Sequence, residues 1–225
     1  MINKLKKYLF RRKTPVLFDD SLRTEPISHF IGTERGTPID RYYIEQFMSA
    51  NRSCIKGVVL EIAEKYYSAK YDSGVKSFEI LHAIADNPNA TIVGDLTDYI
   101  TLPEGNIDCF ICTQTFNFIF DVQSAIKGAY KLLKPGGIML GTVAGISQIS
   151  RFDMERWGDY WRFTDLAMRN LLEEHFSEVK IKTFGNVLAA KAFLDGITVE
   201  DLPEKSLLDV DDTNYQLIVA FKAKK

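Results

Sequence analysis

A short run in the first third of the chain limits the possible fold most. The run GVVLEI at 57–62 is rich in β-branched residues and almost wholly apolar, as expected of a strand buried on both faces of a parallel sheet. Further short apolar runs lie at 74–80, 90–95, 107–113, 138–143, 179–184 and 215–223. We therefore expect a sheet of seven strands.

Helical patterns separate several of these runs. In DVQSAIKGAYKLLKPGG, Asp121 caps a helix whose apolar residues share one face, and Pro135 and two glycines end it. Two other helices are expected to begin at Thr37–Pro38 and at Thr164. Strands that alternate with helices predict an α/β fold with a doubly wound, mostly parallel sheet. The ligands of such sheets bind at the carboxyl ends of the strands.

Charge is distributed unevenly along the 225 residues. The first thirteen residues carry six Lys or Arg and no acid, so the formal charge of −2 becomes −8 once those six are set aside. Such an acidic body is a poor surface for nucleic acid. We expect a basic arm at 1–30 and a single domain at 31–225.

The basic arm has two interpretations. Ile2, Leu5 and Leu9 recur at helical intervals among cations, which suits a helix on an anionic membrane surface. A charge run of this kind is also typical of a solvated arm. The chain has no signal-peptide core and no run that could span a bilayer, so we expect a cytoplasmic protein, with peripheral membrane contact as the alternative.

Cysteine and histidine spacing gives no sign of a metal site. Cys109 and Cys112 fall in a predicted strand, where residues three apart point to opposite faces. With Cys54 they make an odd number of cysteines, which forms no disulfide framework. The three histidines lie far apart, so we expect no bound metal.

Acidic residues follow the first three predicted strands. Glu61 and Glu64 flank the first turn, Glu79 ends the second run and Asp95 closes the third. Carboxylates at these positions suit the hydroxyls of a ribose and the amino group of an adenine. Acids at strand ends also serve as helix caps or solubilising groups, so no single one decides the ligand.

The first turn argues against a phosphate-bearing ligand. Residues 63–73 contain no glycine, whereas a phosphate-binding turn needs closely spaced glycines, so dinucleotides and ATP are disfavoured. S-adenosylmethionine (SAM) is an adenosine without phosphate. Its sulfonium can rest on aromatic faces, which Tyr66, Tyr67 and Phe116 could supply.

Several segments resemble class I SAM-dependent methyltransferases. They are LEI, GDL and LKPGG and, more specifically, RGTPIDRYYIE at 35–45, GISQISRFDMERWGDYWRFT at 145–164 and GNVLAA at 185–190. The longer segments are similar to those of a bacterial, methyltransferase type 11-like subfamily whose members often occur beside or fused to glycosyltransferases. The resemblance covers nearly the whole chain after about residue 30. It implies a Rossmann-like, seven-stranded sheet with an antiparallel last strand.

The resemblance also implies contacts with SAM. It places Arg41 and Tyr42 at the methionine carboxylate, Glu61, Ala63, Glu64 and Tyr66 at the first turn, Glu79 and Ile80 at the ribose, Asp95 and Leu96 at the adenine, and Thr113, Gln114 and Phe116 beside the sulfonium. Ala63 departs from the nearer relatives, which usually keep a glycine there. We expect it to permit close approach only at negative φ, because the left-handed conformation costs a non-glycine residue about 1–2 kcal/mol.

The stretch RWGDYWRFT, after the fifth run, suits a sugar-like acceptor. Indoles stack on pyranose rings, and Asp and Arg bond hydroxyls. We expect Trp157, Tyr160, Trp161 and Arg162 to bind the acceptor and Asp159 to act as the base or to orient it. The alternative is a packed lid in which Asp159 pairs with Arg156 or Arg162, with His29 or His82 as the base.

The predicted function is SAM-dependent O-methylation of a sugar or glycan precursor in cell-surface polysaccharide biosynthesis. A second hypothesis is a methyltransferase-fold protein with an impaired cofactor site that acts as a scaffold for a glycosyltransferase. The missing glycines at 63–73 motivate it. A third, an NAD-dependent sugar oxidoreductase, lacks the dinucleotide fingerprint.

Overall fold

The computed structural model describes residues 23–225. Residues 1–22, which carry the basic run and its predicted membrane contact, lie outside the described part. Among the described residues, no helix is long and apolar enough to cross a membrane. The last residues of the expected arm contact the domain, because the backbone N–H groups of Ile27 and Ser28 donate to the Asp195 carbonyl.

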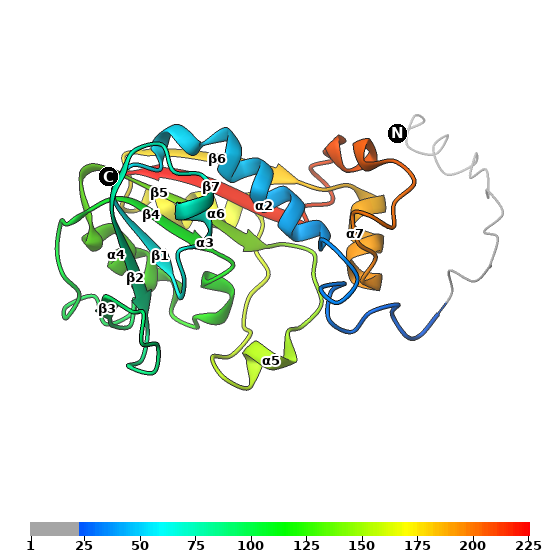
Figure 1. Ribbon diagram of the computed structural model, residues 1–225, viewed down its shortest axis with the longest axis horizontal. Helices are drawn as coiled ribbons and strands as arrows, with labels where there is room; N and C mark the ends of the chain where they lie inside the picture. The colour runs from blue at the N-terminus through cyan, green and yellow to red at the C-terminus, as the bar shows by residue number, and fades with distance from the viewer. Residues whose placement is uncertain (1–22) are drawn as a thin grey trace, which may run out of the picture.

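A seven-stranded sheet forms the centre of the molecule (Figure 1). Its strands are β1 (Gly57–Ile62), β2 (Val75–His82), β3 (Ile92–Val93), β4 (Ile107–Thr113), β5 (Leu133–Ala144), β6 (Glu178–Phe184) and β7 (Ile218–Lys224). The spatial order is β3-β2-β1-β4-β5-β7-β6. The strands from β1 to β5 pair in parallel, and β7 runs antiparallel to both its neighbours. The predicted doubly wound sheet with an antiparallel last strand is confirmed.

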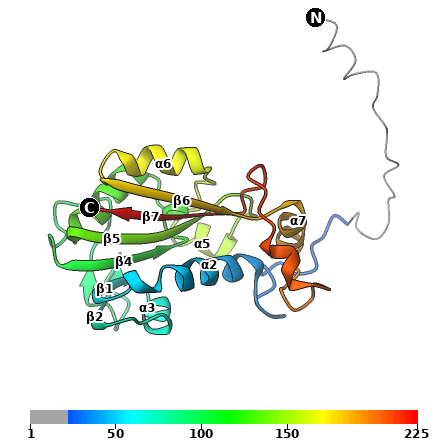
Figure 2. The ribbon, with the colours of Figure 1, turned by 90° about the horizontal axis from the view of Figure 1, so that it is seen from above.

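Helices cover both faces of the sheet; Figure 2 shows α6 on one side and α2 and α3 on the other. The helices are α2 (Ile39–Ala50), α3 (Tyr66–Lys70), α4 (Val122–Leu132), α5 (Arg151–Met154), α6 (Asp165–Glu173) and α7 (Val187–Asp195). One core packs α4 and α6 against the sheet, and a second packs α2, α3 and α7 against the other face. Cys109 and Cys112 lie in different cores, as the strand pattern predicts.

Side-chain caps begin two helices where the sequence predicts them. Asp121 accepts a hydrogen bond from Ser124 N, and Thr164 accepts one from Ala167 N. The expectation that Thr37 caps the first helix is wrong. Pro38 holds the N-cap position of α2 without a side-chain cap, while the Thr37 hydroxyl donates to Glu200 at 2.7 Å.

The LKPGG segment lies inside a strand and not in a connecting loop. β5 begins at Leu133, directly after α4, instead of at the expected residue 138. Leu133 pairs with Ile107, but Ile138 pairs with Cys109, so the residues between them form a bulge. Gly136 has a φ of 77° within it, a conformation that glycine adopts without strain. The proline and glycines therefore mark a bulge as well as the end of the helix.

Candidate functional site

A cavity of about 880 Å³ opens at the carboxyl ends of β1, β4 and β5. β1 lies between β2 and β4, so the chain order reverses here, which is where doubly wound sheets bind their ligands. The wall includes residues of α2, of the segment after β5, of α7 and of the segment at 26–33. Its volume falls within the range of small-molecule sites.

Glu61 fixes the turn that follows β1. Its carboxylate accepts hydrogen bonds from Tyr67 N at 2.9 Å and Ser68 N at 2.8 Å, which lie in the first turn of α3. The side chain lines the cavity although the residue is only 4% exposed. Burial raises the pKa of Glu61 above its ordinary value, and the two backbone hydrogen bonds oppose that rise.

Ala63 adopts the backbone conformation of a glycine. Its φ is 64°, so the negative φ on which close approach was expected to depend is not observed. Ala63 N donates to the Leu81 carbonyl, and its own carbonyl accepts from Asn87 Nδ2 at 2.8 Å. These two bonds hold a left-handed residue at a cost of about 1–2 kcal/mol. The chain keeps the shape of a glycine turn without the glycine.

Arg41 extends from α2 towards this turn. Its Nη1 lies 2.6 Å from the Tyr67 hydroxyl, and its guanidinium lies 5.6 and 5.5 Å from the ring centroids of Tyr66 and Tyr67. Arg41, Glu64 and Tyr67 line the cavity, whereas Tyr66 does not. Tyr42 is directed elsewhere, because its hydroxyl donates to Asp209 at 2.7 Å. Of these tyrosines, only Tyr67 borders the cavity.

The predicted adenosine residues lie outside the cavity wall. Glu79 does not end its strand, because β2 continues to His82, about 10 Å further on at the usual rise. The Glu79 carboxylate accepts from Ser77 Oγ at 2.7 Å, and Ile80 is buried. Asp95 is exposed after β3 and Leu96 is buried.

Some residues at the end of β4 lie in the cavity wall, and another lies in the core. Thr113 and Gln114 line the cavity, and Gln114 has a φ of 48° while its N–H donates to the Thr142 carbonyl. Phe116 is fully buried and stacks on Phe221 at 6.2 Å between ring centroids. The expectation that Phe116 walls the site is therefore wrong, because its ring belongs to the core under α4.

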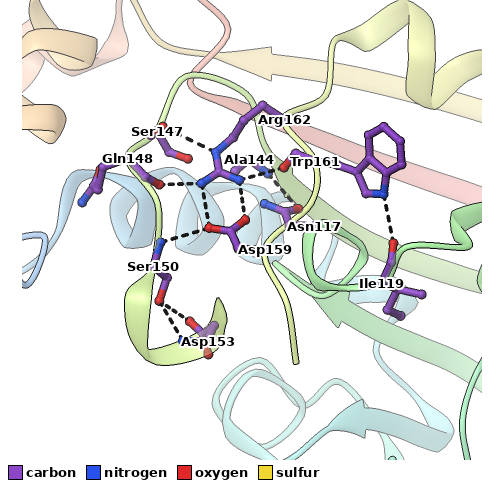
Figure 3. Close-up of polar contacts among 10 residues, drawn as sticks. All are labelled: Asn117, Ile119, Ala144, Ser147, Gln148, Ser150, Asp153, Asp159, Trp161 and Arg162. Atoms are coloured by element: carbon purple, nitrogen blue, oxygen red, sulfur yellow. Dashed lines mark hydrogen bonds and ion pairs between the residues drawn. The ribbon is translucent and has the colours of Figure 1, made fainter. Parts of the chain in front are cut away.

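Asp159 and Arg162 meet at the cavity wall (Figure 3). Arg162 donates from Nη1 to Oδ1 at 2.5 Å and from Nη2 to Oδ2 at 2.9 Å, and its guanidinium also bonds the carbonyls of Ser147 and Gln148. Burial alone would raise the pKa of the Asp159 carboxyl, but hydrogen bonds from Arg162 and Ser150 N hold it below its usual value. The predicted lid pairing of Asp159 with Arg162 is thus observed.

The aromatic side chains of this segment point away from the cavity. Figure 3 shows the Trp161 indole directed to the Ile119 carbonyl, with Nε1 at 3.1 Å. Trp157 packs edge-on against His82 at 5.7 Å, and Tyr160 packs against Phe120 at 5.4 Å. None of these three aromatic residues lines the cavity, so the expected sugar platform does not form inside it.

Two further polar residues, His29 and Gln148, belong to the cavity wall. His29 lines the wall and its side chain is 68% exposed, with Glu25 at 3.4 Å, whereas His82 does not line it. Gln148 Oε1 is buried without a hydrogen-bond partner among residues 23–225. No sequence pattern pointed to Gln148, because only the folded segment after β5 brings it to the wall. Over the same part of the chain, no three His, Cys, Asp or Glu side chains gather as a metal site.

Comparisons with known proteins agree with this architecture. Residues 54–141 match the family model described as methyltransferase domain. A search of curated proteins gave no match. The fold resembles a SAM-dependent methyltransferase from Mesorhizobium loti, with 12% identity over 83% of this chain and 98% of that one and a TM-score of 0.55.

Two further solved structures share the fold. The N-methyltransferase NodS from Bradyrhizobium japonicum, in complex with S-adenosylhomocysteine, has 15% identity over 85% of this chain and 89% of that one, with a TM-score of 0.53. A SAM-dependent methyltransferase from Archaeoglobus fulgidus has 14% identity over 82% of this chain and 90% of that one, with a TM-score of 0.50. Residues 54–141 therefore match a methyltransferase domain, and the whole fold is shared with solved SAM-dependent methyltransferases.

Proposed function

We propose that this protein is a SAM-dependent methyltransferase that transfers the methyl group to a hydroxyl oxygen of a sugar or glycan precursor used in cell-surface polysaccharide biosynthesis. The observation that carries the proposal is the unpartnered, buried Gln148 Oε1 in the wall of the cavity that also contains Glu61. A buried oxygen that accepts no hydrogen bond costs about 1–3 kcal/mol. A hydroxyl group of the substrate could donate the missing hydrogen bond. A glycosyltransferase partner and membrane contact through residues 1–13 remain predictions.

The residues at the first turn fit the methionine end of SAM. Ala63 has the left-handed backbone of a glycine turn but still carries its Cβ, and the Glu61 carboxylate holds the first turn of α3. Arg41 donates one of its five N–H groups to the Tyr67 hydroxyl, so other N–H groups can bind a carboxylate. Glu64, Thr113 and Gln114 complete this end of the cavity.

The adenine is proposed to lie against Asp95. Both hydrogen bonds from Thr97 go to Oδ1, so Oδ2 remains available to an amino group. We expect Asp95→Ala to weaken S-adenosylhomocysteine binding about tenfold, the value of one hydrogen bond to a charged group. Glu79→Ala is the comparison variant, since its position along β2 predicts a smaller effect. Equal effects of the two changes would contradict this placement.

Catalysis then requires positioning and removal of one proton. Methyl transfer is an in-line displacement, so holding the acceptor oxygen against the methyl group supplies most of the rate. A hydroxyl acceptor must also lose its proton, and the His29 imidazole at the wall is placed to accept it. Asp159 has all of its observed bonds to Arg162 and Ser150, so we assign it a positioning role.

The direct test is methyl transfer from labelled SAM to a panel of monosaccharides, methyl glycosides, sugar nucleotides and amino sugars, with the product located by NMR. We expect an O-methyl product, and His29→Gln should lower kcat while leaving S-adenosylhomocysteine affinity unchanged. A methyl group found only on nitrogen would overturn the hydroxyl assignment. The solved N-methyltransferases of the same fold make the nitrogen acceptors a necessary part of the panel.

A further inference from the structure

The mouth of the cavity is apolar. Four large hydrophobic side chains line it although they are exposed: Phe30 (71%), Ile149 (52%), Phe152 (64%) and Leu194 (43%). They come from three separate segments, namely the segment before α2, the α5 region and α7. Exposed apolar side chains that cluster in this way are typical of binding surfaces, whereas single exposed apolar residues are common anywhere on a protein.

The backbone holds these side chains in place. Phe30 N and Gly32 N both donate to Ser28 Oγ at 3.0 Å, and the turn they form is tied to the end of α7 through the Asp195 carbonyl. Across the mouth, Ser150 caps α5 and its N–H donates to Asp159 at 3.0 Å. Phe152 is thus positioned by the Asp159 and Arg162 pair.

The inner end of the same cavity is polar. Arg41, Glu61 and Glu64 lie there, and Gln148, whose Oε1 is buried without a partner among residues 23–225, also lines the wall. The apolar mouth is continuous with this end and not a separate patch. A molecule that filled the cavity from the reacting hydroxyl outwards would need a polar head and an apolar tail.

We infer that the methyl acceptor is an amphiphile, with a hydroxylated head inside the cavity and an alkyl or prenyl chain that lies against Phe30, Ile149, Phe152 and Leu194. The inference rests on the proposed function and adds the substrate class. The chain buries apolar surface on both walls of the mouth. One face of the Phe152 ring already carries the Arg156 guanidinium at 3.5 Å, which leaves the other face to the chain.

The test compares the binding of n-octyl β-D-glucoside and methyl β-D-glucoside, both below the micelle concentration, to the full chain saturated with S-adenosylhomocysteine. Calorimetry should show the octyl glucoside binding at least about tenfold more tightly, as expected for half-burial of aromatic rings. The double variant Phe30→Ser with Phe152→Ser should reduce that ratio to below about threefold. Thermal unfolding and S-adenosylhomocysteine affinity establish that the variant is folded.

Phe120→Ser is the matched control. Phe120 is 69% exposed, as Phe30 is, but it does not line the cavity, so its loss should leave the chain preference unchanged. Equal affinity for the two glucosides, or a preference that the double variant retains, would overturn the inference. These are binding measurements, so they are separable from the proposed function, which fails if no methyl group reaches a hydroxyl.

Discussion

Asp159 and Arg162 form a bidentate ion pair next to the segment that carries α5. The Asp159 side chain is 1% exposed, and that of Arg162 is 28% exposed. The same carboxylate accepts from Ser150 N, and the same guanidinium bonds the Ser147 and Gln148 carbonyls. The pair therefore joins the two ends of the segment that runs over the cavity.

Loss of this pair should destabilise the protein. Arg162→Ala leaves a buried carboxylate without its cation, and we expect the free energy of unfolding to fall by roughly 2–4 kcal/mol. Arg162→Lys keeps the charge but not the planar fork, so its loss should be smaller. Urea unfolding of the two variants measures both values. An alanine variant within about 0.5 kcal/mol of the wild type would show that the pair is not structural.

Ala63→Gly should stabilise the chain, against the usual direction for a change to glycine. At a φ of 64° the alanine is strained by about 1–2 kcal/mol, and relief of that strain exceeds the added entropy of the unfolded glycine. Ala69→Gly, an exposed position in α3, is the control and should cost about 0.5–1 kcal/mol. Thermal melts of both variants decide the point, and a lower Tm for Ala63→Gly would refute the strain.

Glu61 should give the stability of the protein a pH dependence. Burial raises its pKa in the folded state above the ordinary 4.5, so the folded chain binds this proton more tightly than the unfolded chain does. The stability of the wild type relative to Glu61→Gln is greatest below that value and falls as the pH rises through the raised pKa. Urea unfolding of both proteins across this range measures it, and a constant difference would contradict the assignment.

Asp201 should give the stability of the protein a pH dependence of the opposite sign to that of Glu61, and at lower pH. Hydrogen bonds from Thr198 N, Arg35 and the Thr198 hydroxyl lower the pKa of Asp201 to about 2. Its contribution is therefore present above the ordinary value of 3.8 and is lost as the pH falls through about 2. We expect the difference in Tm between the wild type and Asp201→Asn to shrink over that interval. A difference that persists at the lowest pH would contradict a stabilising role for the ionised Asp201 carboxylate.

Local patterns predicted most of the fold. The apolar runs marked all seven strands, and Asp121 and Thr164 cap their helices as expected because capping depends on adjacent residues. The bulge at LKPGG was missed, since proline and glycine end a helix and interrupt a strand with the same residues. Thr37 failed as a cap because Glu200, distant in sequence, takes its hydroxyl.

The site was less predictable because it depends on contacts between distant segments. Whether Trp161 faced an acceptor or the Ile119 carbonyl could not follow from the composition of its own stretch. Phe116 likewise follows a strand end but turns into the core towards Phe221. The conformation of Ala63 is set by Leu81 and Asn87, and Gln148 reaches the wall only through the path of the chain after β5.

The cofactor site is tested most directly by calorimetric titration with S-adenosylhomocysteine. We predict one molecule bound per chain, with affinity lowered at least about tenfold by Arg41→Met, which would remove the proposed charge-assisted bond to the methionine carboxylate. Tyr67→Phe is the control, because it removes the hydroxyl that Arg41 contacts at 2.6 Å but keeps the guanidinium, and it should bind nearly as the wild type does. No binding at millimolar ligand, or equal affinity of Arg41→Met and the wild type, would contradict the account.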